Sequence, residues 1–530
     1  MAILRYLENP LDDLLRRAAA RGGDGPAVTA GEATLTYPGM DREADRIAHC
    51  VRRTVRRPGA AVAAAPTPDT VFPCVYYGVL RSGHPLALVD PQMGPAALHE
   101  VLTTAGAEIA FVPAALAEVL LKLEDRLPHL HTVVVTDAAD GVAPGSAVPL
   151  AAALAGVPQT PYEPAAADVD AVACTQFTPH GAGGLRPVRF THRNLIANAA
   201  QTAIAHQLVP GAVVVSHLPL HHPAHLNAAV HAGSRQVLCT DPDPWAGLAL
   251  AARTGAAHYY GLSSRLERLA RDERFTAGHP DLAGLRLRAV LAGGTALEAA
   301  TARRLRDVLG VPVLQGYGLR ELCTLSHHQL PGARPGLGAV GVPLPGTECR
   351  VVAPAGRTPV PVWATGAVEV RGPQVAPGSL GAAAPDGEDG WLRTGDAGYL
   401  DEDGGLHVVD HLGDVFACDE ALVAPSLVER VIGEDPRVAE CIVADWPDPV
   451  HGALVWAGIV LRDGAPSAGS AGLLDVLDSI AERANSRLGP GEQIRRLEAL
   501  DSVPRGPGGT PARRRVRTRL HAQAAVEAAA

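Results

Sequence analysis

The chain has 530 residues, of which 47% are hydrophobic and 19% are charged, and its formal net charge is −10. Because one hydrophobic core stops growing near ~250–300 residues, this length predicts more than one domain. The apolar content excludes a disordered or fibrous protein, and the negative charge gives no electrostatic basis for binding nucleic acid or an anionic membrane. We therefore expect a multidomain globular protein with neither kind of partner.

The cysteines and the N-terminal residues indicate the compartment. No two of the eight cysteines form a CxxC pair, so neither a zinc ribbon nor a disulfide scaffold is expected. Residues 1–9 include Arg5 and Glu8 and no apolar run, which is unlike a signal peptide. The stretch 194–234 lacks Asp, Glu, Lys and Arg, but prolines and histidines interrupt it, so we predict no membrane span. Together these features predict a cytoplasmic protein.

Short apolar runs alternate with helical patterns up to about residue 170. Strands are predicted at 33–37, 61–65, 86–89, 109–112 and 133–136. Helices are predicted between them, for example at 95–105, and the same alternation continues from 211 to 315. This rhythm predicts an α/β fold with parallel, doubly wound sheets.

A strand–helix–strand unit lies near the middle of the chain. Strands are predicted at 287–291 and 311–315, Gly293-Gly294 forms a tight turn, and Gly310 ends the helix. The segment Gly316-Tyr317-Gly318 follows the second strand directly. Since ligands of open α/β sheets bind beyond the carboxyl ends of strands, both glycine-containing segments are candidate binding elements.

The pattern changes after residue 338, where turns rich in glycine and proline separate short β-rich segments. These segments lie at 349–352, 366–371 and 406–409. They predict a small antiparallel or barrel-like subdomain over about 338–410. We place this subdomain inside a large N-terminal domain, 1–412.

A third, α+β unit is expected over 413–520, which is long enough to fold as a small domain. Strands are predicted near 440–445 and 455–461, and a helix is predicted over 471–487. The remaining tail, 521–530, is rich in alanine and is expected to be frayed.

Three blocks of the sequence resemble, in the same order, segments of one enzyme superfamily. They are 191–195 (THRNL), 285–322 and 366–410. On these blocks the chain resembles, from about 11 to 520, the adenylate-forming (AMP-binding) ligases, which include acyl-CoA synthetases, peptide-synthetase adenylation domains and luciferases. The resemblance implies a large N-terminal domain of doubly wound sheets with a β-barrel subdomain, followed by a small, mobile α+β domain.

The resemblance also implies a reaction in two steps. ATP and a carboxylic acid give an acyl-adenylate and pyrophosphate, and the thiol of CoA or of a carrier-protein phosphopantetheine then displaces AMP. The implied cofactors are ATP or AMP and Mg²⁺. The implied partners are a carboxylic acid or acyl ligand and either CoA or an acyl or peptidyl carrier protein. The sequence does not identify the acid.

Residues that resemble the family's adenine site are present. By resemblance, Gly293, Gly294 and Thr295 form the turn beside the base. Tyr317, which Gly318 follows, matches the ring that stacks on adenine, an interaction that requires only a flat aromatic face. The alternative is that Tyr317 is an ordinary core aromatic.

Two carboxylates match the family as well. Asp396 matches the residue that binds the ribose hydroxyls, although an aspartate in a turn is the alternative. Glu321 matches the glutamate that binds Mg²⁺, since a hard cation prefers oxygen ligands.

His222 matches a family histidine near the acyl pocket and is the candidate substrate-binding residue. His221 and His225 lie close to it in the sequence. A metal site formed by these three histidines is an alternative, because imidazole is a common ligand of transition metals.

The segment aligned with the family's phosphate loop differs strongly from it. Only Thr178 and Gly183 are retained, and Arg186 keeps a positive charge where the family has lysine. Pro179 and Pro187 lack the backbone N–H groups that cradle phosphate. An arginine also presents a planar fork in place of the point charge of lysine.

Two catalytic positions differ from the family pattern. Thr510 stands where the family has its catalytic lysine, and the chain's single lysine is Lys122. Losing one preorganised contact of this kind costs ~10²–10³ in rate. Arg320 stands where the family has threonine. Either Arg320 supplies the missing charge, or it pairs with Glu321 and blocks Mg²⁺.

Substitutions continue beyond the barrel-like segment. His411 aligns with the family's ribose- and phosphate-binding arginine, and Gly413 aligns with the hinge. Asp419 or Glu420 stands where a glycine borders the thiol tunnel, so an acidic side chain is expected to obstruct a thiol arm.

Three functions remain open from the sequence. The first is an unusual, active AMP-forming acid–thiol ligase. The second is a pseudoenzyme that binds AMP, an acyl ligand or a carrier protein. The third is a repurposed enzyme that acts on a pre-activated substrate without ATP.

Overall fold

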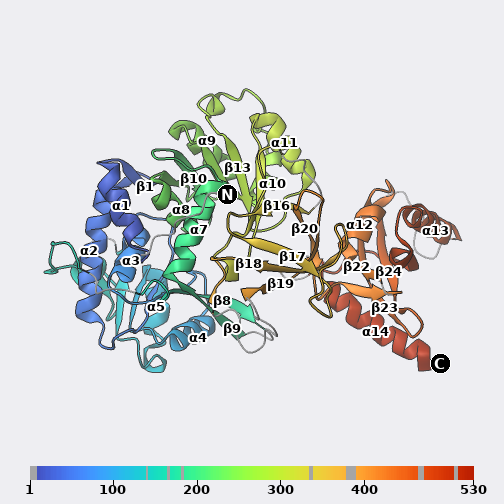
Figure 1. Ribbon diagram of the computed structural model, residues 1–530, viewed down its shortest axis with the longest axis horizontal. Coiled ribbons are helices and arrows are strands. Elements are labelled where there is room, and N and C mark those ends of the chain that lie inside the picture. Colours follow the sequence, from blue (N-terminus) through green and yellow to red (C-terminus); the bar gives the residue numbers. More distant parts are fainter. Residues whose placement is uncertain are drawn as a thin grey trace. The chain divides into compact units, whose positions relative to one another are not determined.

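The structure is a computed structural model that describes residues 9–138, 141–163, 168–180, 184–332, 338–377, 390–419, 421–462, 471–505 and 511–529 (Figure 1). The chain divides into two compact units. Unit 1 comprises Met1–Glu348 and Arg371–Leu392, and unit 2 comprises Cys349–Val370 and Arg393–Ala530. The predicted α/β class is confirmed.

The first sheet of unit 1 has the strand order β7-β6-β5-β3-β4-β8-β9. Its strands are Val148–Pro149 (β7), Thr132–Val135 (β6), Ile109–Val112 (β5), Val62–Ala64 (β3), Leu86–Leu88 (β4), Val172–His180 (β8) and Gly184–Thr191 (β9). Neighbouring strands are parallel except β8 and β9, which form an antiparallel hairpin. The strands predicted near 61–65, 86–89, 109–112 and 133–136 are confirmed as β3 to β6.

The second sheet of unit 1 has the order β16-β15-β14-β13-β12-β10-β11-β1-β2. Its strands are Ala339–Pro343 (β16), His327–His328 (β15), Val313–Tyr317 (β14), Ala289–Gly293 (β13), His258–Leu262 (β12), Val213–His217 (β10), Arg235–Leu238 (β11), Pro26–Ala30 (β1) and Ala33–Thr36 (β2). The strands from β14 to β1 run parallel, whereas β15, β16 and β2 pair antiparallel with their neighbours.

Two predicted strands of this sheet are shifted by two residues. We predicted 287–291 and 311–315, whereas β13 and β14 end at Gly293 and Tyr317. The pairing of Leu291 with Leu314 sets this register, and local hydrophobicity does not encode it. Gly293 and Tyr317 are therefore the last residues of neighbouring strands.

The helices of unit 1 begin and end at recognisable sequence signals. They are α1 (Asp13–Gly22), α2 (Tyr37–Thr54), α3 (Val71–Arg81), α4 (Pro95–Ala105), α5 (Ala114–Leu121), α6 (Leu150–Ala153), α7 (His192–Ala205), α8 (Pro223–Ala232), α9 (Pro244–Thr254), α10 (Ser263–Arg271) and α11 (Ala299–Leu309). Thr191 and Asn194 form a capping box at the start of α7. Gly310, with φ 68°, ends α11 as predicted.

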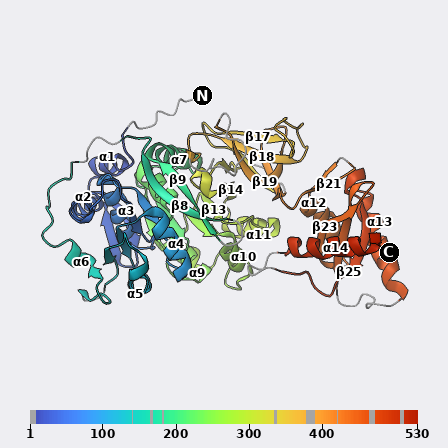
Figure 2. The same cartoon turned by 90° about the horizontal axis from the view of Figure 1, so that it is seen from below.

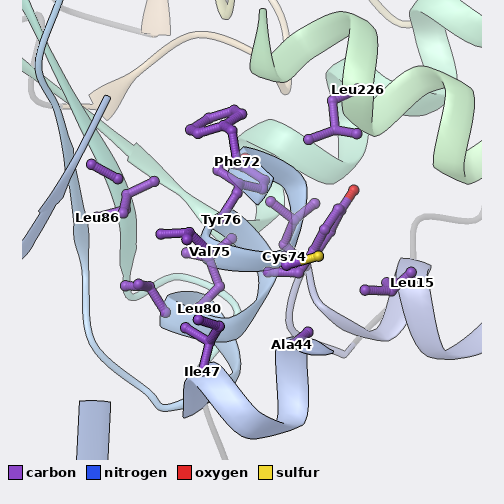
Figure 3. Close-up of a cluster of buried hydrophobic side chains, with 14 of the residues drawn as sticks. Leu15, Ala44, Ile47, Phe72, Cys74, Val75, Tyr76, Leu80, Leu86 and Leu226 are labelled. Atoms are coloured by element: carbon purple, nitrogen blue, oxygen red, sulfur yellow. The ribbon is translucent and has the colours of Figure 1, made fainter. Parts of the chain in front are cut away.

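Helix α3 is the centre of the largest apolar cluster of unit 1, in which Phe72, Val75 and Tyr76 are buried (Figure 3). A Cβ atom at Gly78 would lie 2.5 Å from Ile47, so the glycine permits the close packing of α3 against α2. This packing holds the helices on the first sheet, whose strands lead to the β8–β9 hairpin.

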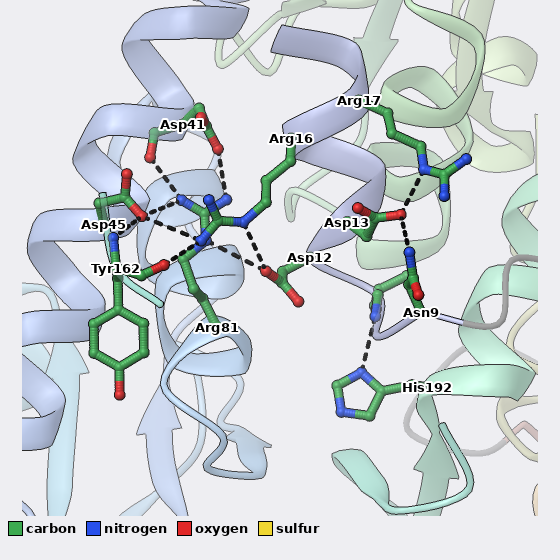
Figure 4. Close-up of polar contacts among 11 residues, drawn as sticks. Asn9, Asp12, Asp13, Arg16, Arg17, Asp41, Asp45, Arg81, Tyr162 and His192 are labelled. Carbon is green, nitrogen blue, oxygen red and sulfur yellow. Dashed lines mark hydrogen bonds and ion pairs between the residues drawn. The ribbon is translucent and has the colours of Figure 1, made fainter. Parts of the chain in front are cut away.

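Arg81, at the end of α3, is fully buried and is held by three aspartates (Figure 4). Its guanidinium contacts Asp12, Asp41 and Asp45, and the Nη1–Oδ1 distance to Asp45 is 2.8 Å. The network links α1, α2 and α3, since a buried charge requires partners that compensate its lost hydration.

Unit 2 contains the strands of the predicted barrel-like subdomain in the order β17-β18-β19-β20. They are Glu348–Val352 (β17), Gly366–Arg371 (β18), Leu392–Leu400 (β19) and Leu406–His411 (β20). The domain boundary predicted at 412 stays a prediction, and the division into compact units groups these strands with the C-terminal part of the chain. Asp410 on β20 accepts hydrogen bonds from the backbone N–H and the hydroxyl of Ser426, at 2.9 and 2.7 Å, which helps to explain that grouping.

The rest of unit 2 is the predicted α+β segment (Figure 2). Its elements are the hairpin β21 (Phe416–Cys418) and β22 (Ala421–Val423), the sheet of β23 (Val438–Asp448), β24 (Gly452–Leu461) and β25 (Ile494–Ala499), and the helices α12 (Pro425–Gly433), α13 (Ala471–Asn485) and α14 (Arg513–Ala529). The tail that we expected to be frayed forms the last turns of α14. Leu520, just before the tail, and Ala524 within it pack against the sheet, which explains the helical structure.

Candidate functional site

The segment aligned with the phosphate loop belongs to the β8–β9 hairpin. Thr178 pairs with Arg186 across the hairpin, and the Thr178 hydroxyl donates to the Arg186 carbonyl at 3.5 Å. The strand pairing extends to His180 and Gly184. Gly183 lies outside the described residues. The hairpin therefore places the Arg186 side chain beside Thr178.

Arg186 forms an ion pair with Glu321, which lies in the 3₁₀ turn Arg320–Leu322. The Arg186 Nη2 atom donates to Glu321 Oε1 at 2.7 Å, and both side chains are partly buried. A second contact holds the same turn. The Ala376 N–H, from the later segment of unit 1, donates a hydrogen bond of 2.9 Å to the Glu321 carbonyl. Glu321, which the resemblance implies binds Mg²⁺, is thus paired with an arginine of the β8–β9 hairpin.

Arg320 does not pair with Glu321, which corrects one of our two expectations for it. Its guanidinium donates to the carbonyl oxygen of Phe177 on β8 instead. The neighbouring Glu321 pairs with Arg186 on β9, so two adjacent residues of the turn contact the two strands of one hairpin. Local sequence could not separate these partners, because the pairing depends on where β8 and β9 lie in space.

The carboxyl ends of β13 and β14 are adjacent, and they carry the residues implied to bind adenine. Gly293 ends β13, and a Cβ atom there would meet no atom within 4 Å, so the surface beside it is open. The Ser263 hydroxyl donates to the Thr295 carbonyl at 2.5 Å and holds the exposed turn that contains Gly294 (φ +93°). This geometry leaves room for a flat ring beside the turn.

Tyr317 ends β14, and its half-buried ring lies 5.9 Å from the ring of His327. The next residue, Gly318, closely approaches the backbone of Thr324. A Cβ atom at Gly318 would lie 1.8 Å from the Thr324 carbonyl oxygen, so only glycine fits there. The loop that follows Tyr317 therefore has no space for a side chain at position 318.

His222 lies at the N-terminus of α8. Its Nδ1 atom accepts a hydrogen bond from the Ala224 N–H at 3.3 Å, and its Nε2 atom lies 3.3 Å from the Thr324 hydroxyl. Burial, together with the positive charge of Arg320, lowers the pKa of His222 to about 4. The imidazole is consequently neutral near pH 7 and close to the 3₁₀ turn.

The alternative histidine–metal site receives no support from the structure. His221 hydrogen-bonds Gln236 (2.8 Å), and the ring of His225 stacks on Tyr260 with 4.5 Å between centroids. Across the described ranges, no group of three or more His, Cys, Asp or Glu residues could hold a metal ion.

In unit 2, Asp396 and His411 face each other across β19 and β20. Their Oδ1 and Nδ1 atoms are 3.0 Å apart, and the hydrogen bond raises the pKa of His411 to about 9. His411 is therefore protonated and positively charged at neutral pH. Asp396 is held by backbone geometry as well, because its N–H donates to the Thr394 hydroxyl at 3.1 Å.

The segment around Gly413 is bound to α14. Arg517 donates to the carbonyl oxygens of Gly413 and Asp414, at 2.7 and 3.0 Å. A Cβ atom at Gly413 would meet nothing within 4 Å. The predicted hinge residue thus has free space where a side chain would lie, while its backbone carbonyl is held by a hydrogen bond.

Asp419, at the β21–β22 turn, has a left-handed backbone with φ 49°. Such a conformation favours glycine, although aspartate tolerates it. Its carboxylate pairs with His451 and, at 2.8 Å, with Arg495. Two other predicted positions, Glu420 and Thr510, lie outside the described residues.

Sequence inspection missed the Arg186–Glu321 pair and a group of polar rings around Tyr260. Both join residues that are far apart in the chain, so no local pattern marks them. The positive charge of Arg186, in the segment that we aligned with the family's phosphate loop, was the one available signal for the first. Among the described helices, none has the length and apolar character needed to cross a membrane.

The sequence matches a known protein family. Residues 15–380 match the family described as AMP-binding enzyme. The chain is 28% identical over 489 residues to a long-chain-fatty-acid–CoA ligase of Yersinia pestis, covering 86% of both chains. It is 26% identical over 516 residues to a feruloyl-CoA synthase of an Amycolatopsis species, covering 95% of this chain and 98% of that protein.

The fold also matches solved structures. ATP-bound MatB from Rhodopseudomonas palustris superposes with a TM-score of 0.78 at 22% sequence identity, covering 97% of this chain and 99% of that one. Because the family match covers more than half of the chain, the protein belongs to the AMP-binding enzyme family, the adenylate-forming ligase superfamily.

Proposed function

We propose that this protein is an acid–CoA ligase-like enzyme that binds an adenosine nucleotide and a carboxylic acid. Its reaction would form an acyl-adenylate and pass the acyl group to a thiol of CoA or of a carrier protein. The observation that carries the proposal is the adjacent placement of Gly293 and Tyr317 at the ends of β13 and β14. Ligands of open α/β sheets bind at such strand ends.

Each retained residue has a specific role in this proposal. Tyr317 presents a ring face to adenine, and the open surface at Gly293 admits the edge of the base. Asp396 accepts hydrogen bonds from the ribose hydroxyls, with the protonated His411 beside it. His222 lies next to the acid, near the Thr324 hydroxyl.

The residues present do not fit Mg²⁺ in the manner that the resemblance implies. Glu321 offers the oxygen ligands that a hard cation prefers, but Arg186 occupies one of these oxygens at 2.7 Å. Arg186 itself brings positive charge to this place. We therefore propose that Arg186, and not a metal ion, balances the negative charge of Glu321.

The Arg186–Glu321 pair also favours a second function, that of a binding protein. In this chain Glu321 is paired with Arg186, and Thr510 stands at the position of the catalytic lysine. Such a protein would bind AMP or an acyl-adenylate but would not catalyse formation of the acyl-adenylate. Each missing preorganised charge removes transition-state stabilisation, while ground-state binding of adenosine uses other residues.

The test is calorimetric titration with AMP and with Mg-ATP, followed by pyrophosphate release assays with a pool of carboxylic acids, with and without CoA. Acid-dependent pyrophosphate release supports the ligase. AMP binding without pyrophosphate release supports the binding protein. Tyr317→Ala is expected to abolish nucleotide binding, and Tyr162→Ala serves as a matched control. Absence of nucleotide binding in the wild-type protein contradicts both functions.

A further inference from the structure

Helix α14 packs on one face of the sheet of β23, β24 and β25 in unit 2 and leaves a groove between itself and β25 (Figure 2). The groove has a volume of about 720 Å³. Its floor is formed by Trp446 on β23 and Trp456 on β24, which are both buried. We name it the tryptophan groove. Its walls are residues 496–498 of β25 and the α14 residues Arg519, Ala522, Gln523, Val526 and Glu527.

Two ion pairs cross the groove between β25 and α14. Arg496 Nη2 lies 3.0 Å from Glu527 Oε2, and Arg519 Nη1 lies 2.9 Å from Glu498 Oε1. Each guanidinium also lies over one of the two indole rings, with 3.8 Å for Arg496 and 5.4 Å for Arg519 between Cζ and the ring centroid. The four charged side chains are 37–57% exposed. Pairs with this exposure contribute about 1 kcal/mol or less to stability, so they can exchange partners.

An exposed apolar side chain stands at the rim of the groove. Val526 is 70% exposed, and its neighbour on the same helix face, Ala522, is exposed as well. A protruding apolar side chain beside an aromatic groove gives one surface patch both halves of a contact. An isologous dimer requires this arrangement, since the same patch of each copy meets its own equivalent.

The charges along this face of α14 are reversed on either side of Gln523. Arg519 lies four residues before Gln523 and Glu527 four residues after it, and all three are exposed. Residues with this spacing share one helix face. When two such helices cross antiparallel at Gln523, Arg519 of each copy lies beside Glu527 of the other. The two Gln523 amides then meet at the twofold axis, where each can donate to the other and accept from it.

We propose that the tryptophan groove is a dimerisation surface. Two copies of this chain associate through α14 about a twofold axis at Gln523, and Val526 of each copy packs against the tryptophan groove of the other. Covering the groove removes exposed apolar surface from water, which favours association. A small anion fits less well, because it must first displace Glu498 or Glu527 from the arginines. One helix and one groove form a small interface, so the dimer is weak, with a Kd on the order of 10 µM.

Sedimentation equilibrium of the full-length protein from roughly 1 to 200 µM tests the proposal, and we expect a monomer–dimer equilibrium. Val526→Arg should raise the Kd at least about tenfold, because an arginine there approaches Arg519 of the other copy. The matched control is Leu474→Arg, at an apolar residue of α13 that is 68% exposed and lies outside the groove. It should leave the Kd unchanged. A wild-type protein that stays monomeric, or an equal Kd in both variants, overturns the inference.

Gln523→Cys locates the twofold axis. The two new thiols lie within reach of each other at the axis, so oxidation with diamide should cross-link the dimer through a disulfide. Leu474→Cys should stay uncross-linked, and the native cysteines are buried or half-buried. A dimer that Gln523→Cys does not cross-link uses another interface, which also overturns the inference. These positions are exposed, so the variants should fold, and circular dichroism checks that they do.

Discussion

The Arg186 guanidinium donates a hydrogen bond of 2.7 Å to the Glu321 carboxylate, across 135 positions of sequence. The pair joins the β8–β9 hairpin to the turn after β14, so the hairpin supplies a positive charge directly to the glutamate. A partly buried pair of this kind persists because each partner compensates the lost hydration of the other.

Removing Arg186 should restore cation binding at Glu321. In Arg186→Gln we expect Mg²⁺ to strengthen ATP binding by about 1 kcal/mol, roughly fivefold, measured by calorimetry with and without the metal. AMP affinity should not change. Arg189→Gln, an exposed arginine on the same strand, is the control. Weaker Mg-ATP binding in Arg186→Gln would mean that the arginine itself binds the phosphates.

The pKa of His411 should depend on its hydrogen-bond partner, Asp396. Its pKa is about 9 in the folded protein against an ordinary value of 6.5, so protonation stabilises the fold below about pH 6.5 and that contribution is lost as pH rises through about 9. Histidine NMR signals followed from pH 6 to 10 measure the value. In Asp396→Asn the pKa should return toward 6.5. An unchanged value would show that Asp396 does not cause the shift.

Acid should destabilise unit 1 through its buried neutral histidines. Burial lowers the pKa to about 3 or 4 in His192, His222, His225, His258, His327 and His328. As pH falls, the unfolded chain takes up these protons before the folded chain does. The free energy of unfolding is therefore highest above about pH 6.5 and decreases as pH drops toward 4. Each histidine contributes at most about 1.4 kcal/mol per pH unit to this decrease. Urea unfolding at several pH values measures the slope, which His327→Gln should reduce by about one proton. A slope that this variant leaves unchanged contradicts the assignment.

Gly318 and Gly293 should respond differently to alanine. The Cβ atom of Gly318→Ala would lie 1.8 Å from the Thr324 carbonyl oxygen, so the loop must shift at a cost of about 1–3 kcal/mol or more. Gly293→Ala meets no atom within 4 Å and should leave stability unchanged. Its methyl group faces the proposed adenine site, so AMP binding should weaken. Thermal unfolding and AMP titration of both variants test this pair, and unchanged AMP affinity in Gly293→Ala argues against adenine beside that turn.

The buried Arg81 should dominate the stability of the first helices. Arg81→Met leaves the charges of Asp12, Asp41 and Asp45 without their shared partner, which typically costs about 3–5 kcal/mol (Figure 4). Denaturant unfolding measures the loss. Arg46→Met removes a half-exposed pair with Glu43 and should cost less than about 1 kcal/mol. Similar losses in both variants would contradict the importance of the buried network.

Much of the fold could be predicted because its signals are local. The apolar runs that became β3 to β6 lie within a few residues of their predicted bounds, and Gly310 ends α11 as expected. Near the site, the prediction was two residues early for β13 and β14, since pairing between strands sets their ends. Of the two expectations for Arg320, pairing with Glu321 was wrong for the same kind of reason, because its partner Phe177 lies 143 positions away.

The sequence by itself determined the α/β alternation, the turn glycines and the residue types at the positions proposed to bind adenosine, since periodicity and turn chemistry act over a few residues. Only the tertiary structure decided that Arg186 neutralises Glu321 and that His206, His225, Tyr260 and His328 form one cluster. These contacts join separate helices and strands. They exist because the packing of elements, and not the order of residues, brings such side chains within a few ångströms.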